Sequence, residues 1–116
     1  MSQQAKAQQE RRQQRFELQK PVPVVNLQND TSMGALVNIT IEGLMIMSNE
    51  ALETNRLYQI QLQLPETVNG HDRVDLGVDC LWSRSDEQLG RHWAGFQIID
   101  ASQAAIKVIE AMIRNQ

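Results

Sequence analysis

The 116-residue sequence is poor in the residues from which most metal and catalytic sites are built. It has one cysteine, Cys80, and two histidines, His71 and His92. One thiol cannot form an internal disulfide, and a structural zinc site needs about four ligands. The sequence also has no pairing of a nucleophile with a base. We therefore expect no metal, no cofactor and no enzymatic activity.

Long apolar runs are absent as well. No stretch approaches the roughly 18 apolar residues that cross a bilayer. The opening residues, MSQQAKAQQERRQQR, have no apolar segment after their charges, which excludes a secretory signal peptide. We expect a cytoplasmic protein without membrane insertion, and the lone thiol of Cys80 suits that reducing compartment.

Positive charge is scarce outside the first twenty residues. Residues 1–20 hold five Lys or Arg and two Glu, a net charge of +3 in a chain whose total is −3, which leaves −6 on the remainder. A domain of that sign repels DNA and RNA over most of its surface. We expect a flexible basic leader at residues 1–20, and an acidic domain at residues 21–116 that binds a small anion rather than a long nucleic acid.

The sequence after the leader predicts a β-structure. Six short runs, rich in alternating or β-branched apolar residues, are bounded by Gly, Asn, Asp or Pro. They are PVPVVNLQ, ALVNITI, GLMIMS, RLYQIQLQLP, RVDLGVDCLWSR and HWAGFQIID. In the fourth run the apolar positions approach a period of two, with glutamines facing out: Leu57, Ile60, Leu62 and Leu64. The pattern indicates an antiparallel barrel or sandwich of six strands.

The end of the sequence changes to a helical period. Its apolar residues fall three and four apart: Ala105, Ile106, Ile109, Met112 and Ile113. We predict a helix at about residues 101–114 that packs this stripe over one opening or face of the β-domain. Asp100 and Gln103 have the spacing of a capping box at its start.

Two polar motifs remain. Arg11 and Arg15 have the spacing RxxxR, and residues 38–43 read NITIEG, or NxTxxG, straight after a strand-like run. Each has an ordinary interpretation: a solvated charge run for the arginines, turn chemistry or cross-strand pairing for Asn38 and Thr40, and a turn or bulge for Gly43. A functional interpretation of Gly43 is a positive φ angle and close approach of the backbone to a ligand.

In this order the two motifs resemble the signature of the PilZ domain, in which RxxxR precedes the first strand and (D/N)xSxxG lies between the second and third. The stretch CLWSR, with Trp82, resembles a tryptophan-bearing strand of that family, and WAGFQIID resembles its last strand before a helix. The resemblance spans about residues 11–113. It implies a mainly β fold, a six-stranded antiparallel β-barrel with a C-terminal α-helix.

The resemblance further implies a bacterial receptor for the second messenger cyclic di-GMP. The residues it assigns to the ligand are Arg11, Arg15, Asn38, Thr40 and Gly43, with Arg12 and Trp82 as further possible contacts. The two arginines of RxxxR would contact phosphate and guanine, because a guanidinium forms paired hydrogen bonds with either group. Asn38 would bind a guanine edge, and Thr40 a phosphate or a base.

Two residues depart from the pattern of the family. Thr40 stands where serine is usual, and its added methyl group restricts the rotamers and crowds the site, so we expect weaker binding. Glu10 precedes the first arginine, at a position where a basic residue accompanies binding of the ligand as a stacked dimer. The number of ligands per chain therefore stays open.

The expected role is that of a stand-alone receptor and adaptor. On this hypothesis the leader closes on the dinucleotide, and a partner protein of the motility, adhesion or polysaccharide machinery recognises the altered surface. The alternative is a PilZ-like interaction module that binds proteins and no nucleotide. A third interpretation is non-specific RNA binding by the leader, although two Trp, one Tyr and two Phe provide little stacking surface.

Overall fold

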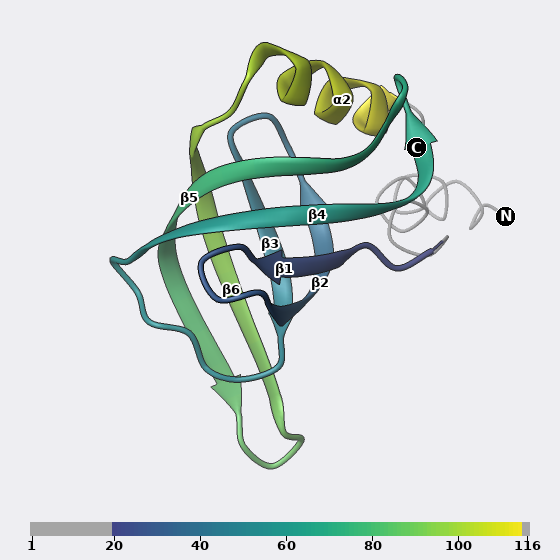
Figure 1. Cartoon of the computed structure of the whole chain (residues 1–116). Coiled ribbons are helices and arrows are strands. Elements are labelled where there is room, and N and C mark those ends of the chain that lie inside the picture. Colours follow the sequence, from purple (N-terminus) through teal and green to yellow (C-terminus); the bar gives the residue numbers. More distant parts are fainter. Residues whose placement is uncertain (1–19, 115–116) are drawn as a thin grey trace, which may run out of the picture.

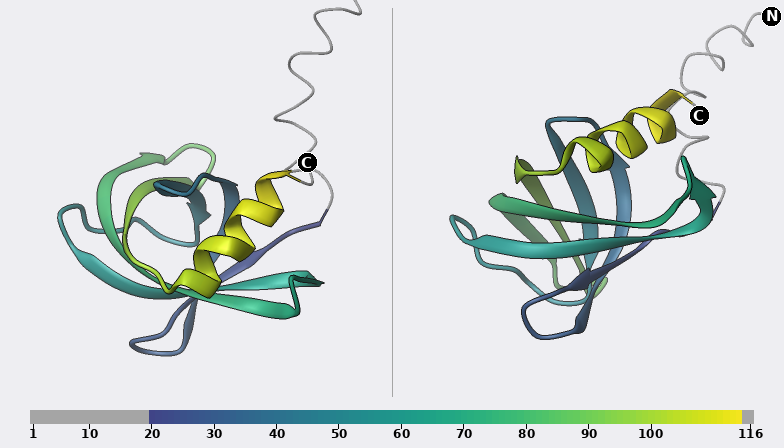
Figure 2. Two further views of the ribbon diagram at one scale, coloured as in Figure 1. Left: turned by 90° about the horizontal axis from the view of Figure 1, so that it is seen from above. Right: turned by 45° about the horizontal axis from the view of Figure 1, so that its top comes forward.

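The structure, a computed structural model, describes residues 20–114 of the chain. The elements are β1 (Pro23–Asn26), β2 (Thr31–Ile39), β3 (Gly43–Ser48), β4 (Leu57–Val68), β5 (His71–Asp86), β6 (Arg91–Asp100) and α2 (Gln103–Arg114). The strands form a closed antiparallel barrel in the order β1-β2-β3-β6-β5-β4, and α2 lies across one end of it (Figures 1 and 2). This confirms the barrel with a C-terminal helix and excludes the sandwich. Arg11, Arg12 and Arg15 lie outside the described residues.

Strand β4 has the predicted alternation, but the assignment of its first residue, Leu57, to the inward side is wrong. Leu57 is 58% exposed, whereas Tyr58 is buried together with the other apolar residues of the strand. The Tyr58 ring packs edge-on against Phe96, with 6.0 Å between the ring centroids. Since side chains alternate between the two faces of a strand, burying Tyr58 directs Leu57 outward.

The core lies inside the barrel and continues under the helix. Every strand contributes apolar side chains to it. The largest that are fully buried are Ile46, Ile60, Leu62, Leu76, Ile109, Val24, Val78, Val108 and Cys80. Cys80 is a small side chain of this core, and its thiol donates to the Trp82 carbonyl oxygen at 3.5 Å. Burial raises the pKa of this thiol, so it stays protonated.

The helix begins two residues later than predicted, and its cap differs. The Ser102 hydroxyl accepts a hydrogen bond from the Ala105 N–H at 3.0 Å, so Ser102 is the N-cap. Asp100 instead ends β6, where it pairs with Gly77, so the predicted capping box is wrong. The helix buries Ala105, Val108, Ile109 and Ala111, while Ile106, Met112 and Ile113 are only partly covered. Strands β4 and β5 make the most extensive strand contacts with the helix.

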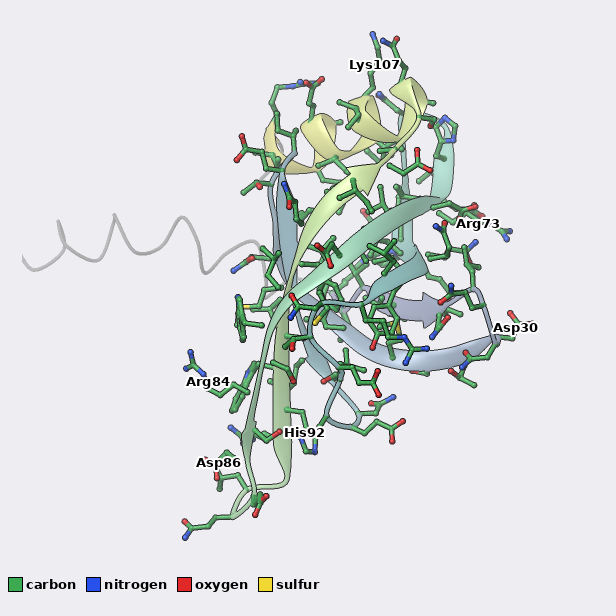
Figure 3. All side chains as sticks on the ribbon, turned by 90° about the vertical axis from the view of Figure 1, so that its left-hand side faces the viewer. Asp30, Arg73, Arg84, Asp86, His92 and Lys107 are labelled. Atoms are coloured by element: carbon green, nitrogen blue, oxygen red, sulfur yellow. The ribbon has the colours of Figure 1, made fainter. Side chains whose placement is uncertain are left out.

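The hairpin of β5 and β6 extends beyond the rest of the barrel (Figures 1 and 3). Strand β5 pairs with β4 only as far as Asp79, whereas its pairing with β6 continues to Asp86. The second half of β5 therefore has a strand on one side only. Across residues 20–114, no helix has the length and apolar character needed to span a membrane.

Candidate ligand-binding face

Thr40 builds the turn between β2 and β3. Its N–H donates to the Gly43 carbonyl oxygen at 2.8 Å. Its hydroxyl oxygen accepts from the N–H groups of Glu42 at 3.1 Å and Gly43 at 3.2 Å. The hydroxyl proton has only a long contact, 3.4 Å, with the Gly43 carbonyl oxygen. The side chain thus has a structural role in the turn. Its hydroxyl proton can still be donated to another acceptor.

Gly43 is required by packing, and the expected positive φ angle is wrong. The described glycines with positive φ are Gly34, Gly70 and Gly90. Gly43 pairs with Gln97 of β6, and a Cβ added to Gly43 would overlap the Phe96 carbonyl oxygen. The close approach that this glycine permits is therefore between β3 and β6.

Asn38 lies on the outside of the barrel, next to a bulge in β2. Leu36 pairs with Ile46 and Asn38 pairs with Met45, which leaves Val37 as the extra residue. The side chain of Asn38 is exposed and makes no hydrogen bond to any residue from 20 to 114. Its amide therefore has a donor and an acceptor available on the outer surface.

Trp82 lies on the outside of β5, next to a second bulge. Cys80 pairs with Phe96 and Trp82 pairs with Gly95, which leaves Leu81 as the extra residue. The indole fills the space above Gly95, where a Cβ would overlap it, and the side chain is 36% exposed. The Arg84 guanidinium carbon lies 5.4 Å from the ring centroid, within the range of a cation–π contact.

Strand pairing brings Asn38 and Trp82 into one row across four strands. Asn38 pairs with Met45, Met45 with Gly95, and Gly95 with Trp82. Three strand spacings of about 4.8 Å separate the ends of this row, a span of roughly 14 Å. The neighbouring row runs from Gly43 through Gln97 to Asp79. We name the outer surface formed by these two rows the site face.

Met45 and Gln97 are residues of the site face that sequence reasoning missed. Met45 is a half-buried member of the first row, and Gln97 is an exposed member of the second. Alternation along β3 and β6 indicates that both point outward. Their place between Asn38 and Trp82 depends on the pairing of β3 with β6, two strands far apart in the sequence, and no local signal reveals it.

The chain enters the barrel beside the strand that carries Asn38. The Leu36 N–H donates to the Val22 carbonyl oxygen at 2.9 Å, which extends the pairing of β1 and β2 toward the start of the chain. The ammonium group of Lys20 pairs with the Glu66 carboxylate at 2.5 Å and lowers the pKa of that carboxyl group. Lys20, the first described residue, thus lies just before β1, the strand between β2 and β4.

A groove of about 480 Å³ lies elsewhere, between the start of α2 and the first half of β5. His71, Arg73, Asp75, Asp100 and Ser102 are among its lining residues, and no predicted ligand residue is. Within residues 20–114 no cluster of three or more His, Cys, Asp or Glu side chains is arranged to hold a metal ion. The described part of the predicted site is thus an open strand surface.

Three solved structures share this fold. The Bacillus subtilis inhibitor of motility MotI/DgrA aligns with a TM-score of 0.66 and 13% identity over 84% of this chain and 47% of its own. The cyclic di-GMP-bound PilZ domain of YcgR from Escherichia coli aligns with a TM-score of 0.61 and 12% identity over 84% and 82%. A tetrameric PilZ protein of Xanthomonas campestris aligns with a TM-score of 0.52 and 23% identity over 77% and 51%.

This chain spans about half the length of the Bacillus and Xanthomonas chains. No curated protein matches its sequence. Residues 9–115 match the PilZ domain family, a stretch that contains both RxxxR and NxTxxG. Since the match covers almost the whole chain, and the barrel is that of solved PilZ domains, the chain belongs to the PilZ domain family.

Proposed function

We propose that the chain is a bacterial receptor for cyclic di-GMP, which it binds on the site face with the help of residues 1–19. One observation carries the proposal. Asn38, Gly43 and Trp82 share the site face, and Asn38 lies on β2, which pairs with β1, the first strand after residues 1–19. The family supports the ligand class, because the YcgR PilZ domain was solved with this dinucleotide.

The described side chains suit a guanine nucleotide. The Asn38 amide can donate to and accept from a guanine edge, and it has no hydrogen-bond partner within residues 20–114. The Thr40 proton can be donated to a phosphate oxygen or to a base acceptor, while its oxygen holds the turn. The exposed part of the Trp82 indole offers stacking of about 1–3 kcal/mol per base.

The arginines of residues 1–19 carry the positive charge that would bind the phosphates. Arg15 is five residues before Lys20, and five extended residues span at most about 18 Å, which is comparable to the length of the row on the site face. Arg11 and Arg15 would then reach a ligand on this face and grip phosphate or guanine through paired hydrogen bonds, with Arg12 as an additional positive charge. Ordering the leader in this way changes the shape and charge of one side of the barrel.

The altered surface transmits the binding event to another protein. The chain acts in the cytoplasm as an adaptor, and a partner protein of the motility, adhesion or polysaccharide machinery recognises its bound form. Of these, motility has the support of one structural neighbour, which is described as an inhibitor of motility. Catalysis has no part in this role, and no cofactor beyond the ligand is needed.

Isothermal titration calorimetry with cyclic di-GMP tests the proposal. Saturable binding is expected for the wild-type chain, none for Arg15→Ala, and none for GTP in place of the cyclic dinucleotide. Arg73→Ala is the matched control, because Arg73 is an exposed arginine of β5 whose ion pair, with Asp72 at 3.3 Å, lies outside the site face. Binding that persists in Arg15→Ala, or is lost equally in Arg73→Ala, would contradict the assignment. The stoichiometry shows whether one or two ligands bind.

The second candidate is a PilZ-like protein-interaction module that binds no nucleotide. Two observations favour it: the Thr40 hydroxyl already serves the turn, and apolar side chains such as Met47 and Ile99 are exposed on the outer surface of β3 and β6. Absence of heat at high micromolar cyclic di-GMP, with the fold intact by circular dichroism, would favour this second function. Binding of any polynucleotide that weakens steeply with salt would instead favour RNA binding.

A further inference from the structure

The second half of β5, Leu81–Asp86, is an open edge. On one side it pairs with β6, from Trp82 to Asp86. On the other side, pairing with β4 ends at Asp79, and the last backbone bonds are those of Cys80 with Asn55 and Arg56. No described strand pairs with the six residues that follow on that side. Unpaired backbone N–H and C=O groups on a strand edge are a template for another strand.

The edge lacks one common protection against pairing, a proline. A second stretch with one described neighbour, the end of β4 from Gln63 to Val68, contains Pro65, which has no N–H to donate. Leu81–Asp86 contains no proline, and strongly exposed leucines lie at its first residue and just beyond its end. Leu81 is 53% exposed at the start of the edge and Leu89 is 60% exposed at the hairpin tip.

We propose that this edge pairs antiparallel with the same edge of a second copy of the chain. The two-fold axis passes through Ser85, so Ser85 faces Ser85 of the second copy. This register places Arg84 opposite Asp86 of the second copy, twice per dimer, and brings Leu81 to the level of Leu89 of the second copy. An edge that is complementary to itself in both charge and apolar surface fits an isologous dimer.

The neighbouring registers are less favourable for physical reasons. An axis at Arg84 would place two guanidinium groups opposite each other, a like-charge pair. An axis at Ser83 would bring Asp86 of the second copy to the level of Cys80, whose outward N–H and C=O already bond to Arg56 and Asn55. The Ser85 axis is therefore the register that combines opposite charges with an unoccupied edge.

Arg84 and Asp86 are positioned for cross-strand contacts. They project from the same side of the hairpin, with His92 on the other side (Figure 3). The Arg84 side chain is exposed, and its contact in the described structure is with the Trp82 ring. Asp86 uses one carboxylate oxygen to accept from the N–H groups of Gln88 and Leu89, at 3.1 and 3.2 Å, which leaves the other oxygen for a guanidinium.

Sedimentation equilibrium of the whole chain, without nucleotide, tests the dimer and does not depend on the proposed ligand. The wild type is expected to approach twice the 13.2 kDa chain mass at high protein concentration. Arg84→Asp and Asp86→Arg should each be monomeric, since each replaces an opposite-charge pair by a like-charge pair. An equimolar mixture of the two variants should restore the dimer, because the carboxylate introduced in one variant then faces the guanidinium introduced in the other.

Arg73→Asp makes the same charge change far from the edge and should remain a dimer. Because Asp86→Arg also removes the acceptor of the hairpin turn, the double variant Arg84→Asp/Asp86→Arg provides a second readout, and it should dimerise if it folds. Circular dichroism reports folding for each variant. A monomeric wild type at several hundred micromolar, a dimer that tolerates Arg84→Asp, or a mixture that stays monomeric would each overturn the proposal.

Discussion

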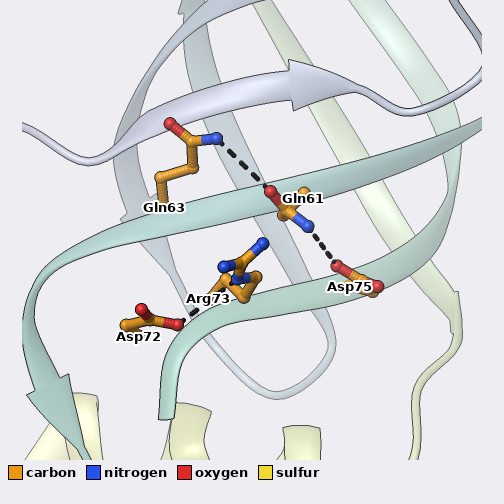
Figure 4. A network of polar contacts seen from close by, with 5 residues as sticks. All are labelled: Gln61, Gln63, Asp72, Arg73 and Asp75. Atoms are coloured by element: carbon orange, nitrogen blue, oxygen red, sulfur yellow. Dashed lines mark hydrogen bonds and ion pairs between the residues drawn. The ribbon is translucent and has the colours of Figure 1, made fainter. Parts of the chain in front are cut away.

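Two parts of the outer surface of the barrel, both facing solvent, differ in their chemistry. On β4 and the first half of β5, polar side chains satisfy one another: Gln61 Nε2 donates to Asp75 Oδ1 at 2.9 Å, and Gln63 Nε2 donates to Gln61 Oε1 at 3.3 Å (Figure 4). On the site face, Asn38 has no described hydrogen-bond partner, and Trp82 is exposed beside Met45. We name the first of these surfaces the polar face.

The difference bears on which of the two surfaces would gain more from being covered by a ligand. Cross-strand amide and carboxylate pairs contribute a few tenths of a kcal/mol each and need no other partner. The exposed part of the Trp82 ring and the half-buried Met45 thioether gain from being covered, because burying apolar surface contributes about 25 cal/mol per Å². The site face is therefore the side of the barrel on which substitutions should affect recognition.

The largest expected effect is on stability, and it distinguishes the inner side of β3 from its outer side. Ile46 is fully buried and its neighbour Met47 is 40% exposed on the opposite side of the strand. Ile46→Ala should lower the free energy of unfolding by about 2–5 kcal/mol, because it leaves a cavity. Met47→Ala should cost less than about 0.5 kcal/mol. Urea denaturation measures both; an equal loss would mean that Met47 is packed like a core residue.

The next largest effect is on ligand affinity, compared between a variant of the site face and a variant of the polar face. If cyclic di-GMP binds as proposed, Trp82→Ala should weaken binding by roughly ten- to a hundredfold, the equivalent of about 1–3 kcal/mol of lost stacking. Gln61→Ala, an exposed substitution on the polar face, should leave the affinity unchanged. Calorimetric titration of both variants decides the comparison. Equal weakening, or none in either variant, would remove the distinction between the two surfaces.

The sequence predicts the barrel well because strand alternation and turn residues are local signals. It fails where a choice depends on distant contacts. Leu57 rather than Tyr58 is the natural first inward residue of β4 until the ring of Phe96 is in place. The cap at Ser102 was missed because Asp100 is held in β6 by its pairing with Gly77, and no pattern in the helix itself reveals that.

For the site, the sequence supplies the motif but not the surface. Asn38, Thr40 and Gly43 are neighbours in the chain, so their common location follows directly. Trp82 joins them through three strand pairings and two bulges, at Val37 and Leu81, and each bulge changes the register. The role of Gly43 was also out of reach, because the Phe96 carbonyl oxygen that excludes a Cβ comes from a strand more than fifty residues away.

A smaller effect is expected at Thr40, where the motif of the site face also has a structural role. Thr40→Ala removes the acceptor for two turn N–H groups and should cost about 1 kcal/mol of stability, whereas Thr40→Ser keeps the hydroxyl and should cost less than about 0.5 kcal/mol. Thermal or urea unfolding without nucleotide measures both. Two variants of equal stability would show that the hydroxyl does not hold the turn.

The smallest effect is expected on the polar side of the barrel, where Lys20 meets Glu66 of β4. Hydrogen bonding and charge attraction from Lys20 lower the pKa of the Glu66 carboxyl group below its ordinary value of 4.5. A carboxyl group with a depressed folded-state pKa contributes stability above its unfolded pKa, and the contribution is lost as the pH falls through the folded value. Both side chains are exposed, so water and salt screen the pair. NMR titration should show the Glu66 midpoint rising toward 4.5 in Lys20→Ala and in high salt. An unchanged midpoint would mean that Lys20, the first described residue, is not held against β4 in solution.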